Sequence, residues 1–375
     1  MEELIQDEIA LFKALIEKNK DQPFDFINQF NLPILNALWR VTVGERFDYD
    51  DPKLISIIER LTEMFKRLGR PENVITICFP WINKIFPTFL EKDKSLKTNH
   101  DILNLMFESI KQHQETLDQN DPRDFTDKVL IEIEKTTDKT SSFYGDIGLE
   151  NLANTLFDLF LAGSETTSTT LTWAALYMIR YQEVQGKVQE ELDRVVGTGK
   201  QPSLKDRPNL PYTEVRCLLN SCLQIQVISP TLPCQAVLME TQRFANIVPN
   251  GVQHVCHRDF TVNGLTIPAD TLIQPVFSEI LKGDYWKDGM TFRPERFLDD
   301  AGGVRRDEHF IPFSIGKRQC LGESLAKAEL FLFFTSLVRQ VQFLPEDEDK
   351  VPGENYSPGV TILPMPFKAR LVTRH

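Results

Sequence analysis

The sequence predicts a mainly α-helical protein with a smaller β region. The first half shows apolar residues at helical spacing, and the last third contains short β-prone segments around a turn signal. The 375 residues, 41% of them hydrophobic and 26% charged, are ordinary globular composition and enough to bury a large core. We therefore expect residues 1–375 to form a single domain.

The helical part is predicted from amphipathic patterning. Residues 2–19 show a helical stripe of apolar side chains: Leu4, Ile5, Ile9, Leu11, Phe12, Leu15 and Ile16. Residues 149–180 form the longest helical candidate. Further helices are expected over 53–68, 98–117 and 181–196, and over 120–135, which opens with Asp-Pro and continues as a helix.

The β part is predicted from turn chemistry and alternation. In "FTVNGLTIP", residues 260–268, two β-rich arms flank Asn263-Gly264, the pair that a type I′ hairpin turn prefers. The segment at 360–374, "VTILPMPFKARLVTR", alternates and is β-prone.

Composition excludes several classes of protein. The formal net charge is -12 and the pI is near 5.1, which argues against nucleic-acid binding. The six cysteines show no C-x-x-C spacing, so we expect no disulfide framework and a reducing environment. The N-terminus lacks the pattern of a signal peptide, and no run of about 18 apolar residues predicts a membrane span.

One loop concentrates chemistry around a cysteine. Residues 313–322 show the pattern F-x-x-G-x-R-x-C-x-G, formed by Phe313, Gly316, Arg318, Cys320 and Gly322. A helix predicted over 321–339 places the cysteine at a helix N-terminus, which favours an anion and predicts a lowered thiol pKa. The glycines let a flat ligand approach the backbone, and the arginine suits a carboxylate on that ligand.

Three other interpretations of this loop are open. A lone cysteine often packs as a small apolar side chain. It also serves as a nucleophile, here with His309 as the base. A phosphate-binding loop is a poor fit, because "SIGKRQC" lacks the first glycine and the Ser/Thr of that motif.

The loop resembles the haem-binding signature of the cytochrome P-450 family, the haem-thiolate monooxygenases. The resemblance implies the P-450 fold, haem as cofactor and Cys320 as the thiolate ligand of the haem iron. It also implies that Phe313, Gly316, Arg318 and Gly322 shape the cofactor site.

A second segment resembles the oxygen-activation motif of the same family, A-G-x-[DE]-T-T. It lies within "LFLAGSETTSTTLTWA", residues 159–174. The resemblance implies that Ala162 lies at the cofactor and that Glu165 and Thr166 manage protons. Gly163 weakens the helix, and the Thr166 hydroxyl is expected to bond the Ala162 carbonyl, which opens a groove.

Further motifs agree with this family. "METQRF" and "FRPERF" resemble the segments that form its structural triad, here Glu240, Arg243 and Arg296. "PNGVQH" resembles the turn below the haem, where His254 would bond a propionate. Lys317, Arg318 and Lys327 would mark a basic patch for an acidic reductase.

The resemblance extends to the microsomal, drug- and steroid-oxidising branch. It implies insertion of one oxygen atom from O₂ into a small apolar substrate, a xenobiotic, steroid or fatty acid. Electrons would come from NADPH through a reductase, at the cytosolic face of the endoplasmic reticulum membrane.

Two departures from the family pattern leave open an alternative to an active monooxygenase. We expect the N-terminal sheet, the first helices and the membrane anchor to be absent, since no tryptophan here begins W-x-x-x-R. Residues 215–235 have no counterpart and are expected to be an insertion, either a surface loop or a translated intron. The alternative is an inactive truncated or mis-spliced fragment.

Overall fold

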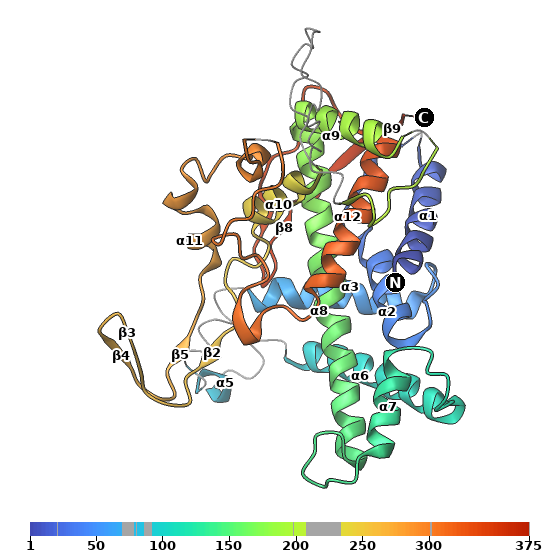
Figure 1. Cartoon of the computed structure of the whole chain (residues 1–375), viewed down its shortest axis with the longest axis vertical. Coiled ribbons are helices and arrows are strands. Elements are labelled where there is room, and N and C mark those ends of the chain that lie inside the picture. The colour runs from blue at the N-terminus through green and yellow to red at the C-terminus, as the bar shows by residue number, and fades with distance from the viewer. Residues whose placement is uncertain are drawn as a thin grey trace, which may run out of the picture.

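The computed structural model describes residues 1–20, 22–69, 79, 81–85, 92–197, 199–207, 234–300 and 302–374. Helices dominate it, as predicted (Figure 1). They are α1 (Glu2–Lys18), α2 (Asn31–Val43), α3 (Pro52–Leu68), α5 (Ile82–Ile85), α6 (Lys92–Thr116), α7 (Phe125–Lys135), α8 (Gly145–Arg180), α9 (Gln182–Val195), α10 (Cys234–Ala245), α11 (Phe277–Lys282) and α12 (Glu323–Gln340).

Helix α8 is the spine of the molecule. Its 36 residues run through the structure, and α2, α6, α7, α9, α10 and α12 pack against it (Figure 1). From Ser164 to Ile179 nearly every side chain is buried, so this stretch has no solvent face. A helix that is covered on all sides is held by its neighbours more than by its own propensity.

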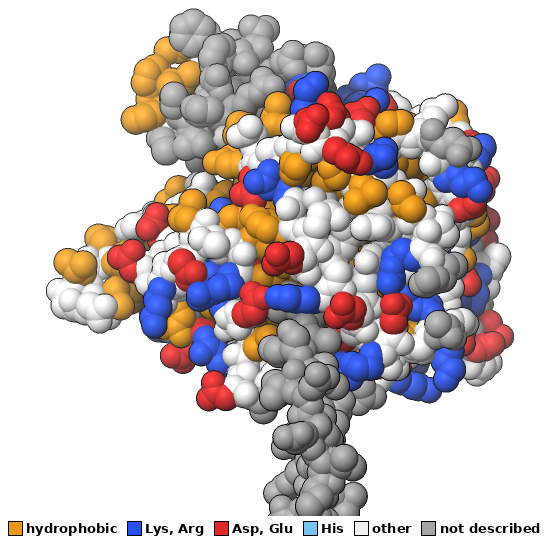
Figure 2. Space-filling view, turned by 90° about the horizontal axis from the view of Figure 1, so that it is seen from above, with side chains coloured by type: hydrophobic (Ala, Val, Ile, Leu, Met, Phe, Trp, Pro, Cys, Tyr) orange, Lys and Arg blue, Asp and Glu red, His pale blue; other side chains and the backbone are white. Residues whose placement is uncertain are grey.

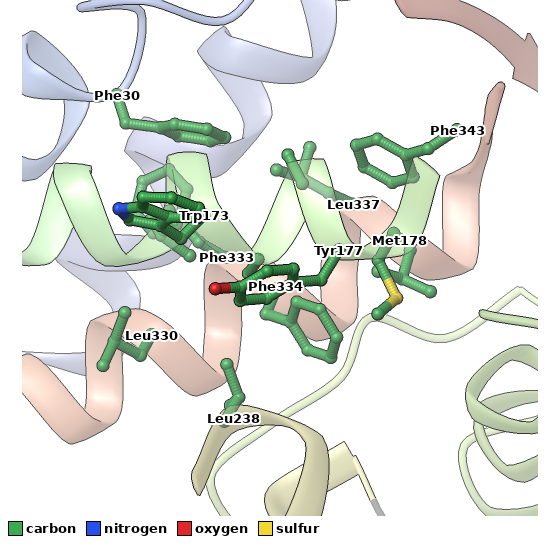
Figure 3. Packing of buried hydrophobic residues seen from close by; sticks show 14 of the residues in the cluster. Phe30, Trp173, Tyr177, Met178, Leu238, Leu330, Phe333, Phe334, Leu337 and Phe343 are labelled. Atoms are coloured by element: carbon green, nitrogen blue, oxygen red, sulfur yellow. The ribbon is translucent and has the colours of Figure 1, made fainter. Parts of the chain in front are cut away.

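The main core lies where α8 meets α12 and α10. Trp173 and Tyr177 of α8 lie close to Phe333 and Phe334 of α12, with Leu238 of α10 below them (Figure 3). All five are buried, and each such side chain contributes about 1.5–3 kcal/mol by leaving water. This packing fixes α12, and therefore the loop that precedes it, against α8.

The β structure is small and antiparallel. Strands β1 (Phe24–Asp25), β9 (Lys368–Thr373) and β6 (Val341–Pro345) form one sheet in that order. Three two-stranded sheets pair β2 (His254–Val255) with β5 (Leu272–Ile273), β3 (Phe260–Val262) with β4 (Leu265–Ile267), and β7 (Tyr356–Ser357) with β8 (Leu363–Pro364).

The predicted hairpin is confirmed. Phe260 pairs with Ile267 and Val262 with Leu265, so Asn263 and Gly264 are the two turn residues. Their φ angles of 50° and 79° are both positive, as a type I′ turn requires. The β-prone segment near the C-terminus is confirmed as β8 and β9.

The helix predictions hold with corrections at four starts. Helix α6 begins at Lys92 and α8 at Gly145, earlier than the predicted 98 and 149. The helix expected to follow Asp121-Pro122 begins at Phe125, because the Asp124 side chain accepts the backbone N–H of Asp127 at 2.9 Å and caps the helix there. The helix after the cysteine loop begins at Glu323 instead of residue 321, with Gly322 at the N-cap.

The predicted insertion falls mostly outside the described residues. Its last two residues, Cys234 and Gln235, are described and form the first turn of α10. Cys234 is fully buried, and its backbone N–H donates to Glu191 Oε2 at 2.6 Å. These two residues of the predicted insertion therefore belong to a packed helix, and the other residues of 215–235 lie outside the described part of the chain.

Charge is mixed over the visible surface. Acidic and basic side chains alternate on the face drawn in Figure 2, and neither sign forms a continuous field there. In the part of the chain that the structure describes, no helix combines the length and the apolar character needed to cross a membrane.

Candidate haem-thiolate site

The cysteine loop forms a tight turn ahead of α12. A single 3₁₀ turn, Gly316–Arg318, is followed by Cys320, whose backbone N–H donates to the Phe313 carbonyl at 2.9 Å. Gly316 has a φ of 80°, a conformation that strains a residue with a Cβ. The turn leaves Cys320 exposed just before Gly322, the N-cap of α12.

The electrostatics of the sulfur differ from the sequence prediction. Although Cys320 is exposed overall, partial desolvation of its sulfur raises the pKa of the thiol, and the neighbouring Glu323 carboxylate adds to this. Backbone N–H groups of Gly322 and Glu323 act in the opposite direction, but they do not prevail. The predicted lowering of the thiol pKa is therefore wrong for the protein alone; a coordinated cation deprotonates a thiol regardless.

Ala162 is the last exposed residue along helix α8. Ala162 is exposed although Phe160 before it and Ser164 after it are buried. The Thr166 hydroxyl donates to the Ala162 carbonyl at 2.9 Å, as predicted. Gly163 has a different role from the one expected: a Cβ there would lie 2.5 Å from Leu38 Cδ2, so the glycine permits α2 to pack closely on α8.

Glu165 lies in the protein interior between three helices. Its side chain is buried, and Oε2 accepts hydrogen bonds from Asn31 Nδ2 of α2 and Thr62 Oγ1 of α3, both at 3.1 Å. Oε1 has no partner among the described residues. Burial raises the pKa of Glu165, which favours the protonated acid.

Two predicted cofactor-binding residues are exposed. His254 lies in β2, paired with Ile273, and Arg318 ends the 3₁₀ turn two residues before Cys320. No hydrogen bond or ion pair joins either side chain to another described residue. The structure therefore leaves both groups available to a carboxylate but does not bring them into contact with Cys320.

The predicted structural triad is confirmed. Arg243 donates to both carboxylate oxygens of Glu240, at 2.7 and 2.9 Å, and Arg296 Nε donates to Glu240 Oε1 at 3.0 Å. All three side chains are buried. Beside Arg296, the ring of Phe297 lies 4.9 Å from that of Phe310, which leads into the cysteine loop. The triad thus supports this loop through a packed aromatic pair.

The residues fit a flat apolar group with an anionic sulfur ligand. Ile315 and Leu321, before and after Cys320 in the chain, are 67% and 84% exposed, so the loop presents apolar side chains to solvent. A Cβ at Gly322 would lie 4.0 Å from Cys320 Sγ, and no other described atom beyond the adjoining residues lies within that distance. A cysteine sulfur in a loop with exposed apolar side chains and small residues fits the donor chemistry of a haem-thiolate site.

Sequence reasoning missed the partners of these groups. Asn31 and Thr62, which bind Glu165, are far from it in the chain and carried no motif. Lys327 also went unrecognised as a contact of the loop: its ammonium lies 5.4 Å from the centroid of the Phe313 ring. The i, i+4 spacing of Glu323 and Lys327 was a signal that could have identified this pair.

Comparison with known proteins identifies the family of this chain. The family model of cytochrome P450 matches residues 1–217 and 224–371, so only 218–223 are unmatched within the chain's interior. The chain is 34% identical to cytochrome P450 2B4 of Oryctolagus cuniculus, over 100% of this chain and 71% of the relative. It is 35% identical to cytochrome P450 2C23 of Rattus norvegicus, over 100% and 71%.

A human relative gives the same result. Cytochrome P450 2J2 of Homo sapiens is 37% identical over 97% of this chain and 67% of its own length. The chain belongs to the cytochrome P450 family, whose members are haem-dependent monooxygenases.

Proposed function

We propose that this chain inserts one atom of O₂ into a small apolar substrate, a xenobiotic, steroid or fatty acid, with Cys320 as the iron ligand. The observation that carries the proposal is the exposed Cys320 at the start of α12, flanked by Ile315 and Leu321. Bound haem supplies the oxidising chemistry, and the protein supplies orientation, proton delivery and exclusion of water.

The cofactor is held by several residues of the chain. Cys320 provides the sulfur, and Phe313, Gly316 and Gly322 shape the loop around it. Arg318 and His254 bind the two carboxylates at the edge of the group, since both side chains are exposed and without a partner among the described residues.

Protons come from α8. The Thr166 hydroxyl, which donates to the Ala162 carbonyl, would be available to exchange a proton on the substrate side of the bound group. Glu165, whose raised pKa favours the acid form, would hold a proton, while Asn31 and Thr62 orient its carboxyl group through Oε2. Burial of Glu165 shields that proton from bulk water.

The electrons are supplied by NADPH through a reductase at the endoplasmic reticulum membrane. The similarity to cytochromes P450 2B4 and 2C23 supports this assignment. Exposed Lys317 and Arg318 beside the cysteine provide positive charge for an acidic partner.

The proposal is tested with ¹⁸O₂. The haem-loaded chain is incubated with reductase, NADPH and a panel of apolar substrates, and products are analysed by mass spectrometry. One ¹⁸O atom per product is expected, and Thr166→Ala should lower the fraction of NADPH that ends in product. Products that take their oxygen from water would contradict the proposal.

A further inference from the structure

The Lys327 ammonium makes two contacts at the cysteine loop. Lys327 lies one helical turn after Glu323 on α12 and forms an ion pair with that carboxylate. Its ammonium also stands over the Phe313 ring, 5.4 Å from the centroid. This is within the range of a cation–π interaction.

Glu323 is held from both sides. Lys327 binds Oε1, and Gln319 Nε2 donates to Oε2 at 3.0 Å. Gln319 immediately precedes Cys320, so the carboxylate is fixed by residues before and after the sulfur. Glu323 also contacts the cysteine directly, since its backbone N–H donates to the Cys320 carbonyl at 3.4 Å.

The three cations that the sequence groups together therefore divide into two kinds. Lys317 and Arg318 are exposed and form no ion pair within the described part of the chain. Lys327 is 38% exposed and neutralises Glu323, which is 24% exposed. The Lys327 charge is therefore paired within this chain and does not depend on a bound reductase.

We propose that the Lys327–Glu323 ion pair sets the electrostatic potential at Cys320, and through it the reduction potential of the group bound there. The inference rests on the proposed ligation by Cys320. Reduction of the group bound at Cys320 brings one electron, and so one negative charge, into the site. A carboxylate beside the sulfur disfavours that added negative charge, and the Lys327 ammonium offsets the carboxylate. Neither residue touches the reacting atoms; both are positioning residues.

Because Lys327 and Glu323 carry opposite charges, removing one or the other should shift the midpoint potential in opposite directions. Midpoint potentials are measured by spectroelectrochemical titration of the haem-loaded chain. Lys327→Met leaves the Glu323 carboxylate unopposed and should lower the midpoint potential by ~59 mV. For a one-electron reduction this shift is about a tenfold change in the equilibrium constant. Glu323→Gln should raise the midpoint potential by a similar amount.

Three further variants distinguish tuning from a loss of structure. The double variant Lys327→Met/Glu323→Gln should return close to the parent value, because both charges are gone. Lys327→Arg keeps the charge and should leave the potential unchanged. The control is Lys350→Met, which removes a lysine from a surface pair with Asp347 after β6 and should shift nothing.

Several outcomes would overturn the inference. Shifts of the same sign in both single variants would mean that the loop is simply damaged. Unchanged potentials with an intact thiolate band in the reduced, carbon-monoxide-bound spectrum would refute the tuning and leave the proposed function standing. Absence of that band from the unsubstituted, haem-loaded chain would refute Cys320 as ligand, and with it both proposals.

Discussion

The guanidinium of Arg243 donates two hydrogen bonds, of 2.7 and 2.9 Å, to the Glu240 carboxylate, and both side chains are fully buried. Arg296 completes the arrangement from the other side at 3.0 Å. The remaining N–H groups of Arg243 donate to the carbonyls of Leu281 and Gly289, at 2.7 and 2.8 Å. One carboxylate thus organises α10, the segment after α11 and the 3₁₀ turn Pro294–Phe297.

Removal of one member of this network should be costly. Arg296→Met leaves part of the buried Glu240 charge uncompensated, so we expect the free energy of unfolding to fall by about 3–5 kcal/mol. Lys187→Met is the matched control, because it removes a cation from the surface pair with the adjacent Glu295. It should cost less than about 1 kcal/mol in urea denaturation. Equal losses in the two variants would contradict this account.

Glu191 makes stability depend on pH. Burial raises the pKa of Glu191 from 4.5 to about 7, while the Cys234 N–H opposes this. A folded-state pKa above the unfolded value means that stability is lost as pH rises from about 4.5 to about 7. Glu191→Gln should remove this loss and gain up to ~3 kcal/mol over the parent between pH 5 and 8. Parallel pH profiles in urea denaturation would refute the assignment.

His113 should show a different pH dependence. Its hydrogen bond with Asp124, 3.0 Å between Nε2 and Oδ2, raises the pKa of His113 against the effect of burial. The stabilising contribution is therefore complete below about pH 6.5 and is lost as pH rises through the folded-state pKa. His113→Gln should lose more stability at pH 6 than at pH 9, by about 1–2 kcal/mol. A uniform loss at both pH values would exclude the charged pair.

Two glycines should respond to alanine with opposite signs. Gly44 has a φ of 74°, and a Cβ there would lie 2.9 Å from Asp124 Oδ2, so Gly44→Ala should cost about 1–2 kcal/mol. Gly186, inside α9, has open space around the added Cβ. Gly186→Ala should stabilise by about 0.5–1 kcal/mol through helix propensity. Thermal unfolding of both variants checks the pair, and destabilisation by Gly186→Ala would contradict it.

The sequence could predict the amphipathic helices because their faces alternate between solvent and core. It did not predict α2, in which Leu32, Pro33, Ile34 and Leu35 follow one another and are all buried. Such a segment has no polar face, and therefore no period to detect. Strand β6 was missed as well, since five residues directly after a long helix carry little pattern of their own.

The site was predictable where its chemistry is local in the chain. Cys320, Gly316 and Gly322 lie within one loop, and Thr166 bonds a carbonyl four residues earlier. The environment of Glu165 depends on contacts over more than one hundred residues, which no local pattern encodes. The direction of the Cys320 pKa shift was mispredicted for a related reason: helix position suggested a thiolate, whereas desolvation of the sulfur outweighs the backbone N–H groups that favour one.

The most direct test of the central claim is a difference spectrum. The purified, haem-loaded chain is reduced and exposed to carbon monoxide, and the same is done with Cys320→Ser. We predict a thiolate-ligated band in the parent and its loss in the variant, with haem content measured in both. A band that survives the substitution would show that another residue binds the iron, and would contradict the assignment of Cys320.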